Sequence, residues 1–256
     1  MRSFYRMSEV NKRLNNLTQD PFFFKCSNLQ NLKKEYSKDS SFCYDKILFY
    51  FASKCKYLQQ LDLTKSYISA LEFANLLNIL DLSYTLDERE EEVSSLGNLE
   101  FLEKLDLGWC HIRPESLCKI LQKIRRMRDL DLRKPSLWDD LKNSYPDLEI
   151  IDLSGNIITS RGIRALAECK KLRKLAMMKM DERCTIDKHS WRRLFSSYQR
   201  LEEVNLRNSD MIFNYDVYEG LTLCKNLRQL YLWDIFSFAI LEQCPKLQTI
   251  YAMRNS

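Results

Sequence analysis

The stretch Leu102-Glu-Lys-Leu-Asp-Leu107 decides the fold of this chain, because its leucine-x-x-leucine-x-leucine pattern returns nine times with related aliphatic residues. Successive copies begin 19 to 29 residues apart. Self-similarity at such a period indicates structural units that stack side by side. The copies begin at Leu58, Leu77, Leu102, Met127, Leu148, Leu172, Leu201, Leu227 and Leu247.

Each copy predicts one short strand, which must share its core with the neighbouring units because it cannot bury its apolar side alone. If the leucines are motif positions 1, 4 and 6, positions 3, 5 and 7 project to the opposite face. The segments between copies have helical spacing, as in residues 114–125, where four aliphatic residues form one stripe. Similar segments are residues 160–169, 187–198, 215–224 and 236–244. We therefore predict an α/β leucine-rich-repeat solenoid, a horseshoe with parallel concave strands and outer helices.

The composition suits a folded protein that binds other proteins. Of its 256 residues, 45% are hydrophobic and 29% charged, which permits a full core and argues against disorder. A net charge of +5 is small for a chain of this length, so we predict no nucleic-acid partner. The longest apolar run, residues 47–52, is far below the roughly 18 residues of a membrane helix, so we predict no membrane span.

Nine cysteines without a Cys-x-x-Cys pair make a poor disulfide framework and favour a reducing compartment. We expect the cytoplasm, with the nucleus or the mitochondrion as alternatives, the latter because residues 2–13 are basic like a presequence. Cysteines that precede a repeat's first leucine by three residues fit small buried hydrophobes. We therefore predict no bound metal and no cofactor. These cysteines are Cys55, Cys169, Cys224 and Cys244.

Two features together resemble a known family. The repeats of the form Cys-Lys/Pro-x-Leu-x-x-Leu-x-Leu resemble the cysteine-containing class common in F-box proteins. Residues 10–24, VNKRLNNLTQDPFFF, resemble the last third of an F-box, where a helix precedes an Asp-Pro segment and an aromatic residue. The chain is thereby identified as a member of the F-box/leucine-rich-repeat family. The places that the resemblance assigns to adaptor binding are Val10, Arg13, Leu14, Leu17, Pro21 and Phe23.

This resemblance implies three parts and a function. Residues 1–30 would be a partial F-box-like helical segment, residues 31–56 a helical capping segment, and residues 57–256 an array of about nine repeats. The implied function is that of a substrate receptor of an SCF-type ubiquitin ligase, with the Skp adaptor and the cullin core as partners. The alternative is a stand-alone scaffold or inhibitor. Because the chain begins after the first F-box helices would have ended, we expect weakened adaptor binding.

Motif position 5 places a row of carboxylates on the predicted concave face. Parallel strands lie about 4.8 Å apart, so these groups would repel one another unless cations intervene. One interpretation is that aspartate is ordinary at this place in the repeat. The other is an acidic strip that attracts a basic segment of a partner. The row consists of Asp62, Asp81, Asp106, Asp131 and Asp152.

The carboxy-terminal repeats lack these aspartates and carry several large side chains at motif positions 5 and 7. Clustered exposed aromatic residues mark binding sites more often than scattered ones do. We predict a protein-binding wall here with Trp233 as its anchor; coverage by the chain's own tail or by a partner subunit is the alternative. The chain stops at Ser256, directly after the ninth predicted strand, with no capping unit to cover the edge of the sheet. We therefore also expect self-association or a need for a partner. The predicted wall comprises Met178, Arg207, Tyr231, Trp233, Tyr251 and Met253.

Catalysis has little support in the sequence. Only two histidines occur, His111 and His189, about three repeats apart, and neither completes a nucleophilic constellation. No glycine-rich phosphate loop and no zinc-ligand spacing is visible. We therefore predict a non-catalytic protein.

Overall fold

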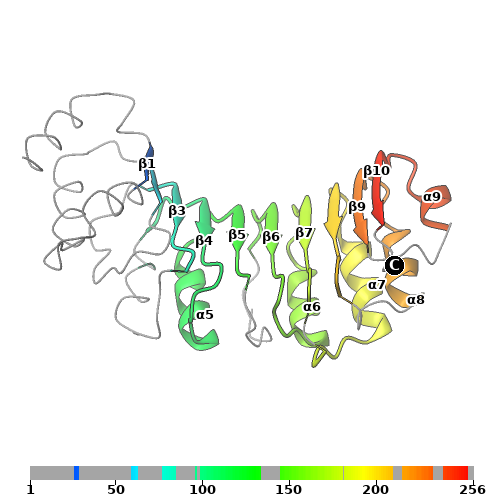
Figure 1. Cartoon of the computed structure of the whole chain (residues 1–256), viewed down its shortest axis with the longest axis horizontal. Coiled ribbons are helices and arrows are strands. Elements are labelled where there is room, and N and C mark those ends of the chain that lie inside the picture. The colour runs from blue at the N-terminus through cyan, green and yellow to red at the C-terminus, as the bar shows by residue number, and fades with distance from the viewer. Residues whose placement is uncertain are drawn as a thin grey trace, which may run out of the picture.

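The computed structural model describes ten short strands and five helices (Figure 1). The described residues are 26–28, 59–62, 77–84, 96, 99–133, 145–180, 182–209, 215–232 and 239–252. The strands are β1 (Cys26–Asn28), β2 (Gln60–Asp62), β3 (Ile79–Asp81), β4 (Lys104–Asp106), β5 (Asp129–Asp131), β6 (Ile150–Asp152), β7 (Lys174–Ala176), β8 (Glu203–Asn205), β9 (Gln229–Leu232) and β10 (Thr249–Ala252). The helices are α5 (Pro114–Lys123), α6 (Ser160–Leu166), α7 (Lys188–Ser197), α8 (Tyr215–Leu221) and α9 (Ala239–Gln243).

All strands belong to one parallel sheet, in the order of the sequence from β1 to β10. Equivalent motif positions face one another without slippage, as in the pairing of Leu80 with Leu105 and of Leu105 with Leu130. The five described helices lie on one side of this sheet, and none of them covers the other side (Figure 1). The predicted solenoid of parallel strands and outer helices is therefore confirmed.

One strand was not predicted. β1 pairs with β2 and adds a rung in which Asn28 stands opposite Asp62. It lies within residues 1–30, for which a helical segment is expected, so the end of that range is a strand of the sheet instead. The F-box-like residues 10–24 and the expected capping segment 31–56 lie outside the described residues.

The leucine positions form one continuous core. In β2 to β8, the middle residue of each strand is buried and its two neighbours are only partly buried or exposed, which is the alternation expected of a strand. The apolar stripe of α5 packs into the same core. Its buried residues are Leu117, Ile120 and Leu121, and Ile124, directly after the helix, is buried with them. The helix-forming spacing seen in the sequence is therefore an inward-facing helix surface.

Two motif positions beyond the strand join neighbouring repeats. Position 8 adopts a left-handed backbone conformation, with positive φ at Tyr84, Trp109, Gly155, Lys179 and Asn208. This turn aims a backbone N–H at the next repeat, as in the bond from Trp109 to the Arg133 carbonyl at 2.6 Å. Left-handed backbone is costly for bulky residues, so the repeat geometry imposes it on the two aromatic ones.

In three repeats, position 9 supplies a buried polar side chain that bonds the preceding repeat, whereas in the repeat of β7 this position is the buried Met180. Cys110 Sγ donates to the Leu82 carbonyl at 3.0 Å, and Asn156 Nδ2 donates to the Leu132 carbonyl at 2.7 Å. Ser209 Oγ donates to Met177 O at 2.7 Å. Three different residue types thus satisfy the same kind of carbonyl, which would otherwise be buried without a partner.

Three of the four cysteines predicted to be buried at the helix-to-strand corner are buried, and the fourth, Cys55, lies outside the described residues. Cys169, Cys224 and Cys244 belong to the core. Burial raises the pKa of Cys169 to about 11 and raises those of Cys224 and Cys244, because a thiolate would lose its hydration there. These thiols therefore act as small apolar groups. Across the described residues, no helix is both long and apolar enough to span a bilayer.

Candidate partner-binding surfaces

The five aspartates at motif position 5 form one ladder on the uncovered face of the sheet. Asp62 pairs in register with Asp81, Asp81 with Asp106, Asp106 with Asp131, and Asp131 with Asp152. We call Asp62, Asp81, Asp106, Asp131 and Asp152 the acidic ladder. The next rungs are Ala176 and Asn205, so the ladder ends at β6.

Members of the acidic ladder also hold the turn that follows their strand. The carboxylate accepts the backbone N–H two residues later, at 2.9 Å for Asp81, 2.8 Å for Asp106 and 2.8 Å for Asp152. Asn205 does the same through its side-chain oxygen at 3.3 Å. Aspartate at this position therefore has a role in the repeat itself, which supports the first of the two interpretations.

Arg133 partly neutralises the centre of the ladder. Its guanidinium reaches Asp131 at 2.6 Å, Asp106 at 3.5 Å and Asp152 at 3.8 Å. Gly108 leaves room for this arrangement, because a Cβ there would lie 3.0 Å from Asp106 Oδ1. The pKa of Asp106 is nevertheless raised to about 6, first by burial and second by the neighbouring Asp131 charge. Burial also raises the pKa of Asp152.

The carboxy-terminal wall is built around two stacked tyrosines. The rings of Tyr231 and Tyr251, which pair in register on β9 and β10, lie 4.5 Å apart and nearly parallel, at 7°. The Arg207 guanidinium carbon lies 4.6 Å from the Tyr231 ring centre and 5.8 Å from that of Tyr251. We call Arg207, Tyr231 and Tyr251 the aromatic cluster. The structure thus brings together three residues that the sequence assigned to one wall.

The residues of the aromatic cluster differ in their exposure to solvent. Tyr251 is 49% exposed, whereas Tyr231 and Arg207 are half-buried. Arg207 Nε is buried and has no hydrogen-bond partner within the described part of the chain. Met178, two repeats before Tyr231, is also half-buried, and its backbone N–H donates to Ser154 Oγ at 2.9 Å. Trp233 and Met253 lie outside the described residues, so their place in the wall stays a prediction.

An exposed aromatic pair escaped the sequence analysis. Tyr84 and Trp109 stack with ring centres 5.7 Å apart and are 52% and 47% exposed. Both occupy motif position 8, where the left-handed turn follows the strand. The alternation of a strand predicts only that positions 3, 5 and 7 face the concave side. It therefore gives no prediction for the rings at position 8. They place apolar surface beside the acidic ladder.

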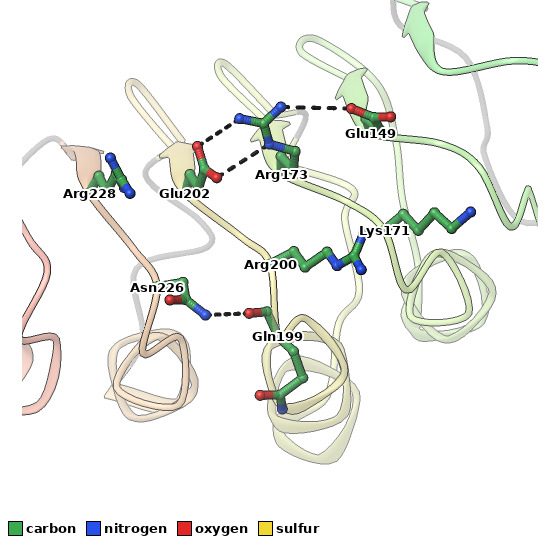
Figure 2. Close-up of a pocket in the computed structure, with 8 residues that line it drawn as sticks. All are labelled: Glu149, Lys171, Arg173, Gln199, Arg200, Glu202, Asn226 and Arg228. Carbon is green, nitrogen blue, oxygen red and sulfur yellow. Dashed lines mark hydrogen bonds and ion pairs between the residues drawn. The ribbon is translucent and has the colours of Figure 1, made fainter.

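A shallow cavity of about 440 Å³ lies where the chain enters the strands from the helices (Figure 2). Arg173 forms ion pairs with Glu202 at 3.0 Å and with Glu149 at 3.8 Å, so these three charges satisfy one another. Arg200 extends across the cavity toward the repeat of Lys171 (Figure 2). The lining residues are Glu149, Lys171, Arg173, Gln199, Arg200, Glu202, Asn226 and Arg228.

Comparison with known proteins identifies the repeats. A family model described as "Leucine Rich repeat" matches residues 98–120 and 146–167, each of which contains one strand and the beginning of the following segment. The chain has the leucine-rich-repeat fold. No significant match is found among curated protein sequences.

Several solved structures have a distant similarity to this chain. They include internalin C2 from Listeria monocytogenes, with 16% identity, a TM-score of 0.45, and coverage of 79% of this chain and 74% of that one. A TLR13–ssRNA13 complex has 15% identity, a TM-score of 0.42, and coverage of 78% and 36%. Internalin InlF from Listeria monocytogenes has 15% identity, a TM-score of 0.41, and coverage of 78% and 68%.

The histidines of the leucine-rich-repeat array lie at the surface. His111 and His189 are both exposed, His111 after the β4 turn and His189 in α7. Within the described residues, no three His, Cys, Asp or Glu side chains are grouped so as to hold a metal ion.

Proposed function

We propose that this chain is a non-catalytic receptor subunit that holds a protein target on the concave face of its leucine-rich repeats. The observation that carries the proposal is the aromatic cluster, in which Tyr251 is half exposed on a face that none of the described helices covers. Repeat arrays of this kind present extended concave binding surfaces. Aromatic residues and arginine are the types most enriched at energetically important interface positions.

The cluster suits a target side chain with an acidic group beside an apolar one. Stacking on Tyr231 holds the plane of the Arg207 guanidinium, which would lower the entropy lost when a carboxylate binds it. The exposed face of Tyr251 would then receive the apolar neighbour. Met178 and, by their repeat positions, Trp233 and Met253 would extend this surface.

The acidic ladder would contribute less to affinity. Its carboxylates already bind their own turns, and Arg133 pairs with three of them. Exposed charge pairs on a screened surface contribute little free energy. The ladder would therefore orient a basic segment of the target and speed its association more than it would strengthen its binding.

The resemblance of residues 10–24 to an F-box supports a more specific form of the proposal, a substrate receptor of an SCF-type ubiquitin ligase. In that role Val10, Arg13, Leu14, Leu17, Pro21 and Phe23 would contact the Skp adaptor, and the cullin core would supply the transfer machinery. The target would be presented by the repeats.

Co-purification with the Skp adaptor tests this form. Residues 1–256 and the longest product of the same gene would each be co-expressed with the adaptor and the cullin. The expected result is stoichiometric recovery of the adaptor with the longest product and weaker recovery with residues 1–256, with both lost in a Leu14→Asp/Leu17→Asp variant. If neither product retains the adaptor while target binding persists, the chain is a stand-alone scaffold or inhibitor instead.

A further inference from the structure

The turns that directly precede the strands carry an excess of positive charge. Seven such turns are described, at residues 100–101, 125–126, 146–147, 170–171, 199–200, 225–226 and 245–246. They contain seven cations and two carboxylates, Glu100 and Asp147. We call the cations the basic rim, and all seven are exposed. They are Arg125, Arg126, Lys170, Lys171, Arg200, Lys225 and Lys246.

The neighbouring motif position 2 adds no net charge but has a regular pattern. It reads Glu103, Arg128, Glu149, Arg173, Glu202 and Arg228, so the sign alternates from one repeat to the next. The distances from Arg173 to Glu202 and Glu149 show that this row forms ion pairs along the array. The excess positive charge therefore comes from the basic rim beside it.

Two cations at the cavity form no close ion pair, although the charge of Arg228 acts on the neighbouring Glu202. Neither Arg200 nor Arg228 forms an ion pair with any residue in the part of the chain that the structure describes. Both are exposed, and both line the cavity of about 440 Å³. Arg200 also extends toward the base of the Lys171 side chain, whose amino group points away from it and pairs with Asp147 (Figure 2).

We propose that this cavity, with the basic rim around it, is a second binding site that takes an acidic peptide segment in extended conformation. Arg200 and Arg228 each offer a planar set of N–H donors that matches a carboxylate or a phosphoryl group. Side chains on one side of an extended peptide repeat about every 6.8 Å. The cations stand on rungs about 4.8 Å apart, and their side chains are long enough for the charged groups to adjust to the spacing of such a peptide.

The lining favours a peptide over a polyphosphate backbone. Glu149 and Glu202 stand among the cations and would repel a chain that carries a charge on every unit and offers few donors. A peptide supplies backbone N–H groups that can donate to these carboxylates. No aromatic residue lines the cavity, so it offers no ring on which a nucleic-acid base could stack.

The site is separate from the concave face and does not rest on the function proposed there. The test is fluorescence anisotropy of the full chain with a labelled ten-residue glutamate peptide. The variant is Arg200→Gln/Arg228→Gln, and the matched control is Lys119→Gln/Lys123→Gln, which removes the same charge from exposed positions of α5. A thermal melt of both variants checks their folding.

We expect the cavity variant to weaken peptide binding at least tenfold and the control to change it less than twofold. A phosphoserine peptide of equal charge distinguishes the two anionic groups, and tighter binding of either one supports the site. Equal weakening in both variants would overturn the proposal, because it would mean diffuse attraction. Preferred binding of a single-stranded oligonucleotide or of phosphatidylserine vesicles, lost in the cavity variant, would overturn the peptide assignment.

Discussion

Arg133 binds both carboxylate oxygens of Asp131 through one edge of its guanidinium, with Nε 2.8 Å from Oδ1 and Nη2 2.6 Å from Oδ2. The same group reaches the carboxylates of the rungs before and after, Asp106 and Asp152, at longer distances. One cation thus serves three carboxylates. The acidic ladder remains incompletely neutralised, and its stability should depend on pH.

Asp106→Asn should make the protein less sensitive to pH. The folded-state pKa of Asp106 is about 6, above its usual value of 3.8, so the folded state binds the proton more tightly than the unfolded state. The resulting stability is complete below pH 3.8 and is lost as the pH rises through about 6. Wild type should therefore lose about 1 to 3 kcal/mol over this range that the variant does not lose.

Urea denaturation between about pH 4 and pH 7 measures this difference. Asparagine can still accept the Gly108 N–H, as Asn205 accepts the equivalent bond in β8. Glu115→Gln, an exposed carboxylate at the start of α5, is the control and should leave the pH profile unchanged. A constant difference between Asp106→Asn and wild type across the range would contradict the raised pKa.

Asn156 should be among the polar residues most costly to replace. Its side chain is fully buried and donates to the carbonyls of Leu132 at 2.7 Å and Leu153 at 2.8 Å. Asn156→Leu would leave both carbonyls without this donor and should lower the free energy of unfolding by about 2 to 4 kcal/mol.

Asn156→Cys should recover part of that loss, because Cys110 makes the equivalent bond in an earlier repeat. Chemical denaturation of the three proteins measures the order of stability. If the leucine variant were as stable as wild type, position 9 would not connect the repeats in the way described.

The buried corner thiols should be inert and sensitive to polar replacement. Cys224 is fully buried, and its Sγ lies 3.7 Å from the Phe195 carbonyl. Cys224→Ser should destabilise by about 1 to 3 kcal/mol, because a buried hydroxyl there would be poorly satisfied. In the native protein, a thiol reagent should modify the partly exposed Cys184 before Cys169, Cys224 or Cys244. Mass spectrometry of the modified peptides shows the order, and early labelling of Cys224 would contradict it.

The sequence predicted the repeat architecture and the concave ladders because two periods agree, the alternation of residues within each strand and the spacing of 19 to 29 residues between repeats. Leucines that recur within each strand and between repeats leave one register that buries them all. β1 was missed because Cys26-Ser-Asn28 lacks the leucine anchors. Its place follows only from pairing with β2.

The surfaces were predicted less completely, for reasons of geometry. Tyr231 and Tyr251 share a motif position, so their proximity was predictable, but the position of Arg207 over them depends on its rotamer. Tyr84 and Trp109 become neighbours through a left-handed turn that alternation does not reveal. The basic rim is invisible in a net charge of +5, because carboxylates elsewhere offset it.

The central claim is that the aromatic cluster holds the target, and side-by-side capture experiments test it most directly. Tagged wild type, Tyr231→Ala/Tyr251→Ala and Leu241→Ala would be purified from the same cells, and their bound proteins quantified by mass spectrometry. Leu241, on α9, is 50% exposed like Tyr251 and serves as the control. Truncating large aromatic residues in an interface typically costs about 2 kcal/mol or more, which is roughly thirtyfold in affinity. We predict a partner that wild type and Leu241→Ala both capture and the double variant loses, and an unchanged set of captured proteins in all three would contradict the account.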